Sequence, residues 1–277
     1  MVLQVLDMNE EAIMFPISRI LLPMDFSDRC LVMLPYVQAF AARYNAELIL
    51  LHVENDNELA KAGRDQLQEF DVRRVLYDGD PADAIAGFVK SEKIDLIAMP
   101  THGYGTFRRF LIGSVTAKVL HDVNCPVLTG VHMEEQPAAD LAKFSNILSA
   151  IDLGPQSASV LKWASQLAAG FQGQFGVVHA VPPLSPGLEL LFSGDWRAEV
   201  ANMARKDVET LLGAIKPAAA AIHIQEGDAP KAVCSLAKTV GADLLVIGRG
   251  PRDRMNGRLT THAYAIIRQS PCPVLSI

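Results

Sequence analysis

The chain contains the same unit twice. The run Cys125–Leu128 recurs at Cys272–Leu275, and the apolar run ending in aspartate at Ile20–Asp25 has its counterpart at Ile147–Asp152. The segments between these runs match in the same order: Gly79-Asp80-Pro81 with Gly227-Asp228-Ala229, Asp95–Ile97 with Asp243–Leu245, and His52 with His179. A repeat of this length is a whole domain and not a solenoid unit. Two similar domains are therefore predicted, and differences between the copies indicate which one kept its chemistry.

The spacing between equivalent positions changes along the copies. It widens between the second and third predicted strands, which places an insertion in the second copy at 182–205. It narrows by one residue between Asp243 and Cys272, in the stretch where we expect a ligand site. The favoured interpretation of the insertion is a longer loop and a helix that covers one sheet face, because long α/β connections are usually scaffold. The alternative is a lid or a partner surface.

The composition is that of a globular protein, with 277 residues, 50% of them hydrophobic, and a net charge of −6. This length accommodates two domains, and the negative charge argues against non-specific nucleic-acid binding. No apolar run is long enough to span a membrane, and the N-terminal residues lack the basic start of a signal peptide. The four cysteines have no metal-ligand spacing, which favours reduced thiols. We therefore expect a cytoplasmic protein with no membrane or nucleic-acid partner.

Apolar runs with little polar alternation are separated by segments of helical spacing. In the first copy the predicted strands are 19–24, 47–53, 72–77, 94–99 and 126–129, and the predicted helices are 28–44, 81–91 and 114–121. Such runs indicate a parallel sheet covered on both faces. The predicted fold class is α/β, with two tandem Rossmann-like domains, each a five-stranded parallel sheet flanked by helices. The predicted organisation is an N-terminal arm at 1–17, a first domain at 18–130, a linker at 131–143 and a second domain at 144–277.

The loop after the fourth strand of the first copy is the candidate anion site. In open parallel sheets, ligands bind beyond the carboxyl ends of the strands. Gly103 allows a tight turn there, and Gly113-Ser114 opens the next helix, whose free N–H groups and dipole favour an anion. His102, Arg108 and Arg109 add donors or positive charge nearby. The Walker loop and the full Rossmann glycine fingerprint are absent from the sequence.

On these motifs the chain resembles the universal stress protein family, in its tandem two-domain form, across residues 18–277. The family's ATP-binding subset has a loop Gly-x-x-Gly, nine residues, Gly-Ser/Thr, which the first copy matches at Gly103, Gly113 and Ser114. It departs at the first glycine, which is Pro100, and a proline removes one backbone donor. The resemblance implies ATP or a related adenine nucleotide such as AMP, with a divalent cation such as Mg²⁺.

The resemblance also implies which residues line the site. Asp25 and Val53 would face the adenosine, and Gly103, Gly113 and Ser114 the phosphates. The implied nucleotide-binding set of the first copy is Pro23, Asp25, Val53, Met99, Pro100, Gly103, Gly113, Ser114 and Val115. From the residues alone, Asp25 could equally cap the following loop.

The second copy is interpreted as a weaker, degenerate site. Gly248 supplies the first glycine of the loop, whereas Pro251 stands in place of Gly103. Its candidate residues are Asp152, Ala180, Gly248, Thr260 and Thr261, with Asp152 more readily explained as a loop cap. Four arginines crowd this loop and would either receive an anion or form a solvated face: Arg249, Arg252, Arg254 and Arg258.

Other polar residues have structural interpretations. We expect His52 and His179 to be hydrogen-bonded histidines near strand ends, and Asp95 and Asp243 to be turn residues. Cys125 and Cys272 are expected to be small packing residues. The sequence shows no catalytic triad or carboxylate pair, so no catalytic residue is predicted.

The leading functional hypothesis is a stress-response protein that binds an adenine nucleotide in its first domain and acts as a sensor or regulator, with slow hydrolysis at most. A second is an interaction protein whose two domains pair through their fifth strands and whose ligand sites are vestigial. A third, an AMP-forming ATP pyrophosphatase-type enzyme, is disfavoured because the first loop, Pro23–Ser27, has no glycine. Association into a homodimer is left open.

Overall fold

The structure, a computed structural model, describes residues 17–54, 72–102, 111–131, 143–183, 196–250 and 259–277. Its strands are β1 (Arg19–Pro23), β2 (Glu47–Glu54), β3 (Arg73–Asp78), β4 (Leu96–Met99), β5 (Val127–Thr129), β6 (Asn146–Ile151), β7 (Gln174–Val181), β8 (Ala221–Glu226), β9 (Leu244–Ile247) and β10 (Val274–Ser276). Its helices are α1 (Asp28–Leu31), α2 (Leu34–Tyr44), α4 (Pro81–Ser91), α5 (Ser114–Asp122), α6 (Ser157–Phe171), α8 (Trp196–Ile215), α9 (Ala229–Val240) and α10 (Thr261–Gln269).

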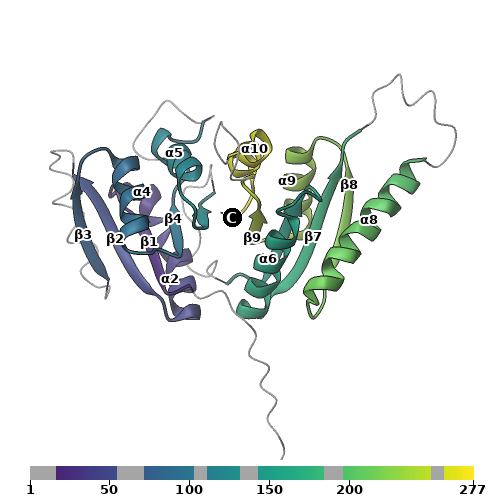
Figure 1. Ribbon diagram of the computed structural model, residues 1–277, viewed down its shortest axis with the longest axis horizontal. Helices are drawn as coiled ribbons and strands as arrows, with labels where there is room; N and C mark the ends of the chain where they lie inside the picture. The colour runs from purple at the N-terminus through teal and green to yellow at the C-terminus, as the bar shows by residue number, and fades with distance from the viewer. Residues whose placement is uncertain (1–16, 55–71, 103–110, 132–142, 184–195, 251–258) are drawn as a thin grey trace, which may run out of the picture.

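The described strands form one ten-stranded sheet in the order β3-β2-β1-β4-β5-β10-β9-β6-β7-β8. All neighbours within each half are parallel. The two halves meet where β5 and β10 run antiparallel, with Val274 opposite Thr129. Each half is thus a five-stranded parallel sheet flanked by helices, which confirms the predicted fold class. Figure 1 shows the halves side by side, with α5 and α10 near the centre.

Alternation along the strands builds a core on each face of the sheet. Ile20 and Leu22 of β1 face one core, whereas Leu21 between them faces the other. Each core contains residues of both halves, so the apolar layers continue across the β5–β10 junction. Burial on both faces explains why these strands read as continuous apolar runs.

An aromatic cluster joins the halves on the α2 and α6 side of the sheet. Phe144 lies just before β6, and its ring centroid is 5.1 Å from that of Phe40 on α2 and 5.0 Å from that of Phe171 at the end of α6. The Phe40 and Phe171 rings meet edge-on at 5.2 Å. Edge-to-face geometry at this spacing is favourable for aromatic pairs, so the cluster helps to hold the halves together.

The helix predicted at 28–44 is wrong as a single element. The structure divides it into α1 and α2, with a turn at Val32 and Met33, and Pro35 lies in the first turn of α2. Proline lacks an N–H and its ring clashes with the carbonyl four residues earlier, so it begins a helix and does not continue one. The second half has no proline at the matching place, and α6 runs unbroken from Ser157 to Phe171.

The insertion of the second half supplies part of α8. This helix packs on β7, β8 and α6, as the scaffold interpretation predicts for a helix over a sheet face. Residues 184–195 lie outside the described residues. The predicted arm and most of the predicted linker also lie outside them, so the domain boundaries stay predictions. Among the helices that the structure describes, none is long and apolar enough to cross a membrane.

Candidate functional site

A cavity of about 800 Å³ lies at the carboxyl ends of the strands in the second half. This volume is within the usual range for small-molecule sites, roughly 300–1,000 Å³. Three helices begin at its wall, because the first residues of α6, α9 and α10 all line it. The N-terminal N–H groups of a helix have no intrahelical acceptor, and the helix dipole adds positive potential there. The cavity is therefore suited to an anionic ligand.

The loop after β6 forms one wall of this cavity. Asp152 Oδ1 accepts hydrogen bonds from the Gly154 N–H at 2.8 Å and the Ser157 hydroxyl at 3.3 Å. The carboxylate thus has the loop-capping role that we expected. Because both bonds use Oδ1, Oδ2 of this exposed side chain can still accept a bond from a ligand.

Gln156 ties this wall to the loop after β9. Its Nε2 donates to the Gly250 carbonyl at 2.7 Å, and its Oε1 accepts from the Gly250 N–H at 2.9 Å. Gly250 has φ +125°, a conformation that side-chain-bearing residues rarely adopt. A Cβ on Gly248 would lie 3.0 Å from Gln156 Oε1. The positive φ favours glycine at 250, and a side chain at 248 would require Gln156 to shift.

Thr260 begins α10 as its N-cap. Its side-chain oxygen accepts from the Ala263 N–H at 3.2 Å, and its own N–H donates to the Arg249 carbonyl at 3.0 Å. The N–H groups of Thr261 and His262, the first two of the helix, have no acceptor within the helix ladder. Both residues line the cavity, so α10 presents two open donors to it.

The two strand-end histidines make the same bond in each half, as predicted. His179 Nδ1 lies 2.9 Å from the Ile151 carbonyl, and His52 Nδ1 lies 2.7 Å from the Met24 carbonyl. Each bond joins the second strand to the end of the first. Ala180, which follows His179, lines the cavity. The five candidate residues of the second copy, Asp152, Ala180, Gly248, Thr260 and Thr261, are thus brought together around one cavity.

The predicted turn aspartates also have matching roles. Asp95 Oδ2 accepts from the N–H groups of Ser18 and Arg19, and Asp243 accepts from those of Ser145 and Asn146. Each carboxylate therefore fixes the start of the first strand of its half. Partial burial raises the pKa of Asp243, and the hydrogen bonds from Asn146 and Ser145 oppose that shift.

In the first half, Asp25 caps its own loop. Its Oδ1 accepts from the Ser27 N–H at 2.9 Å and from the Cys30 thiol at 2.9 Å. Ser27 caps the following helix, because its hydroxyl accepts from the Cys30 N–H at 3.3 Å. Burial, and next the Asp25 charge, raise the pKa of the Cys30 thiol well above its usual range. The loop of Asp25 thus has the same arrangement of hydrogen bonds as the loop of Asp152.

The start of α5 also matches that of α10. Gly113 is the N-cap, and its N–H donates to the Thr101 carbonyl at 2.8 Å, as the Thr260 N–H does to Arg249. This equivalence places the one-residue deletion of the second copy between Arg249 and Thr260. Ser114 is exposed at the first position of the helix, followed by Val115. Gly103 lies outside the described residues.

Larger side chains stand at several first-half positions that are equivalent to residues lining the second-half cavity. Met33, fully buried, stands at the place of Val160, and His102, 5% exposed, stands at that of Gly250. The Phe26 ring lies 4.9 Å from the His52 ring, centroid to centroid. Pro100, half-buried, replaces Gly248, and Met99 replaces Ile247. The cavity at the strand ends that the structure describes lies in the second half, and the predicted site of the first half, which includes Gly103, stays a prediction.

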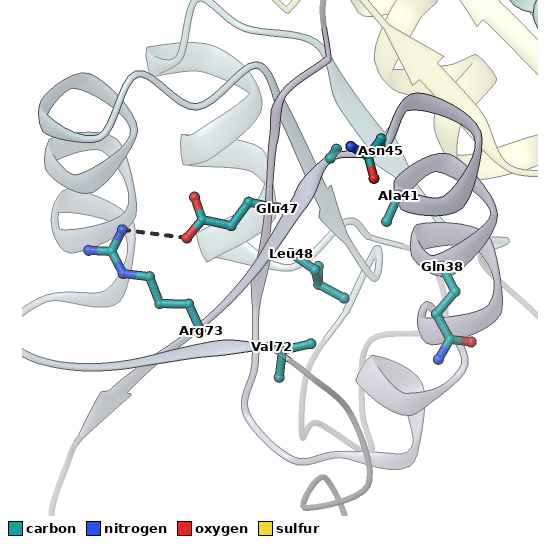
Figure 2. A pocket seen from close by; sticks show the side chains of 8 residues that line it. Gln38, Ala41, Asn45, Glu47, Leu48, Val72 and Arg73 are labelled. Atoms are coloured by element: carbon teal, nitrogen blue, oxygen red, sulfur yellow. Dashed lines mark ion pairs between the residues drawn. The ribbon is translucent and has the colours of Figure 1, made fainter.

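A further cavity of about 680 Å³ lies at the opposite edge of the sheet, between the end of α2 and the starts of β2 and β3. Figure 2 shows Glu47 and Arg73 there, and their charged atoms are 3.9 Å apart. Arg73 also forms an ion pair with Glu92 at 2.8 Å. This cavity lies at the amino ends of the strands, so it is a poorer candidate ligand site than the cavity of the second half.

For Arg249, the prediction that the loop arginines receive an anion or form a solvated face is wrong. Its side chain is fully buried, and its guanidinium donates to the carbonyls of Leu120 at 3.1 Å and Cys125 at 2.6 Å, both in the first half. It is therefore neither solvated nor an anion receptor. The other three arginines, Arg252, Arg254 and Arg258, lie outside the described residues. Within the described residues, no group of three or more metal-ligating side chains is assembled.

Comparison with known proteins places these features in a family. A model described as "Universal stress protein family" matches residues 54–129 and 143–277. The chain is 29% identical over 150 residues to a universal stress protein of Methanocaldococcus jannaschii, covering 40% of this chain and 93% of that protein. It is 29% identical over 138 residues to universal stress protein A homolog 1 of Coxiella burnetii, covering 48% of this chain and 96% of that protein.

Two solved structures match nearly the whole chain. One is a universal stress protein from Archaeoglobus fulgidus DSM 4304, with a TM-score of 0.67 and 23% identity, covering 95% of this chain and 98% of that one. The other, described as functionally unknown, comes from Pseudomonas aeruginosa PAO1, with a TM-score of 0.70 and 20% identity, covering 94% and 92%. At this identity the likeness concerns the fold.

Proposed function

Because this chain belongs to the universal stress protein family, we propose that it is a stress-response protein that binds an adenine nucleotide in the cavity of its second half. Its role in the proposal is regulatory, with binding as the signal and hydrolysis slow at most. The ligand is ATP, AMP or a related nucleotide. The assignment to the second half differs from the site that the loop motif favours, and it rests on the cavity.

The observation that carries the proposal is the meeting of three helix N-termini at one cavity. The starts of α6, α9 and α10 line a space of about 800 Å³ at the strand ends. A phosphate group is stabilised at such a terminus by backbone N–H groups and by the dipole. The wall between the helices is apolar, with Ile151, Val160, Val233 and Ile247, and can receive the face of a base.

Several residues have complementary roles in this proposal. The N–H groups of Thr261 and His262 would meet the phosphate oxygens. Asp152 Oδ2 would accept from a ribose hydroxyl or the base amine. The absence of a side chain at Gly248 leaves room for Gln156, which would hold this wall of the cavity in place around the ligand. Where the nucleotide carries Mg²⁺, Asp152 and Asp228 are the carboxylates of the cavity that could bind it, because carboxylate oxygens suit this ion.

The first half is a second candidate site. Gly113 and Ser114 begin α5 at the position equivalent to the start of α10. Asp25 caps the loop after β1, which is equivalent to the loop that Asp152 caps in the second half. The candidate residues Pro23, Val53, Met99 and Val115 lie at the carboxyl ends of β1, β2 and β4 and at the start of α5. The larger Met33 and His102 side chains favour weaker binding here than in the second half.

Titration calorimetry with Mg-ATP on the full chain, stripped of bound nucleotide, tests the proposal. The variant is Thr261→Glu, which places a negative charge where the phosphates would bind. A carboxylate in the first turn of a helix is tolerated or stabilising, so the fold should be kept. We expect the dissociation constant to rise at least about tenfold, since charge repulsion across one contact exceeds about 1.4 kcal/mol in a protein environment. Thr261→Gln, of similar size and neutral, should weaken binding far less.

The matched variant in the first half is Ser114→Glu, at the equivalent exposed position of α5. If the cavity is the principal site, Ser114→Glu should leave the affinity unchanged. The reverse result, with loss of binding only in Ser114→Glu, would assign the site to the first half. An absence of binding in the wild type at millimolar Mg-ATP would refute nucleotide binding and favour an interaction protein instead.

A further inference from the structure

The starts of helices α5 and α10, which lie at the two candidate loops, are linked across the junction of the halves. Figure 1 shows them facing each other near the centre of the molecule. The Tyr264 hydroxyl, on the first turn of α10, accepts a hydrogen bond from the Ile112 N–H at 3.0 Å. Ile112 immediately precedes Gly113, the N-cap of α5. One bond thus links the start of the second-half helix to the start of the first-half helix.

Arg249 makes a second link in the same direction. It lies between Gly248 and Gly250, both of which line the cavity. Its guanidinium binds the carbonyls of Leu120 at the end of α5 and of Cys125 just beyond it. Its own carbonyl accepts the Thr260 N–H at the start of α10. A displacement of the cavity wall would therefore reach α5 at both ends, through Tyr264 and through Arg249.

The two links are not a consequence of the repeat symmetry. Thr101 occupies the place of Arg249, and its hydroxyl lies 3.1 Å from Nδ1 of its neighbour His102. Ala117 occupies the place of Tyr264 and has no polar side-chain atom. The side chains of both links, Tyr264 and Arg249, come from the second half. These two side chains couple the cavity and the first-half loop in both directions, because coupling between two sites is reciprocal.

We infer that a ligand in the second-half cavity regulates the first half by altering the loop at Ile112–Ser114 through Tyr264 and Arg249. This inference rests on the proposed function. A ligand held by the N–H groups of Thr261 and His262 stabilises one position of α10. Tyr264 lies on the same turn of α10, so fixing the position of this turn also fixes the hydroxyl that accepts the Ile112 N–H. Coupling of this kind requires only that the ligand prefers one of two arrangements of the shared helices.

Hydrogen exchange of the full chain, followed by mass spectrometry with and without Mg-ATP, tests the inference. In the wild type, Mg-ATP should slow exchange in peptides from the start of α10 and also in peptides covering 111–120. Tyr264→Phe removes only the acceptor for Ile112, and Tyr264 is not among the cavity-lining residues. This variant should bind Mg-ATP with unchanged affinity but lose most of the slowing in 111–120, on the order of fivefold. Tyr77→Phe, exposed on β3, is the matched control and should behave as the wild type.

The outcomes separate the two proposals. If the wild type does not bind Mg-ATP, the proposed function is wrong and the regulation fails with it. Binding without any change in 111–120 would leave the proposed function in place and overturn the regulation alone. The same holds if Tyr264→Phe keeps the full effect in 111–120. A remote effect that is lost in Tyr264→Phe and kept in Tyr77→Phe supports the inference.

Discussion

Cys30 and Ser157 occupy the same place in the two halves and make the same contact. The Cys30 thiol donates to Asp25 Oδ1 at 2.9 Å, and the Ser157 hydroxyl donates to Asp152 Oδ1 at 3.3 Å. The second half thus shows that the position accepts a hydroxyl. We expect Cys30→Ser to change the free energy of unfolding by less than about 1 kcal/mol, since the hydrogen bond replaces lost apolar burial. Urea unfolding of the full chain measures this change.

The control for this substitution is Cys30→Ala, which removes the donor and leaves a small gap in a fully packed place. It should cost about 1 kcal/mol more than Cys30→Ser, the usual net value of a hydrogen bond. Equal stabilities of the two variants would mean that the bond to Asp25 contributes nothing and that packing alone decides the residue.

Cys234 on α9 is a second thiol whose chemistry follows from burial. Burial raises the pKa of Cys234 to about 11. An acid whose pKa is raised by folding binds its proton more tightly in the folded state. The stability that it contributes is therefore complete below the pKa of the unfolded thiol, about 8.5, and is lost as the pH rises through the folded value. At pH 8 the folded side chain should be almost wholly protonated.

The thiolate is the form that reacts with alkylating agents. We therefore expect iodoacetamide to modify Cys234 about a hundredfold more slowly in the folded chain than in the urea-unfolded chain at pH 8. Peptide mass spectrometry of the time course measures both rates on the same residue. Equal rates in the two states would show that the thiol is ionised as in water and would contradict the burial argument.

At the scale of the element, Thr260 is the clearest single determinant of a helix start. Its side chain caps α10 by accepting from the Ala263 N–H. Thr260→Val keeps the shape and removes this acceptor, so the free energy of unfolding should fall by about 1 kcal/mol. Thr261→Val, one residue later and without a capping bond, is the matched control and should change it by less than about 0.5 kcal/mol. Denaturant midpoints compare the two, and a larger loss in Thr261→Val would contradict the assigned cap.

Strands and helices were largely predictable from the sequence because the apolar runs of the central strands β1, β4 and β9 are buried in a parallel sheet. The helix at 81–91 coincides with α4, where Asp80 caps the start by accepting from the Ala82 and Asp83 N–H groups. The break between α1 and α2 is also marked in the sequence, by Pro35, but the helical spacing of the apolar residues around it favours one continuous helix. A proline in the interior of such a pattern ends or begins a helix.

The loop motif and the described cavity indicate different halves, because glycine spacing and side-chain volume are different properties. The loop motif pointed to the first half through Gly113 and Ser114. Cavity volume depends instead on whether Met33 or Val160, and His102 or Gly250, stands at the wall. The burial of Arg249 could not be predicted either, because an arginine in a loop is usually exposed. Its partners, the carbonyls of Leu120 and Cys125, lie far away in the sequence.

At the scale of the whole molecule, the two halves share one sheet and both cores. The β5–β10 pairing is supported by side chains as well as by the backbone. The Thr129 hydroxyl donates to the Val274 carbonyl at 3.2 Å, and the Ser276 hydroxyl donates to the Val127 carbonyl at 3.2 Å. The Phe40–Phe144–Phe171 cluster on one face and Arg249 near the other add contacts far apart in sequence. Such a junction should prevent either half from unfolding alone.

This cooperativity can be measured because both tryptophans, Trp163 and Trp196, belong to the second half. Their fluorescence follows the unfolding of that half, whereas far-ultraviolet circular dichroism follows helices of both. We expect the two signals to give the same urea midpoint in the wild type, as two-state unfolding requires. In Phe144→Ala, which removes the ring shared by Phe40 and Phe171, the free energy of unfolding should fall by about 3–5 kcal/mol, and the two midpoints should move apart as the halves separate. Different midpoints in the wild type itself would mean that the halves are independent folding units, and a continuous ten-stranded sheet would then provide no route for regulation between them.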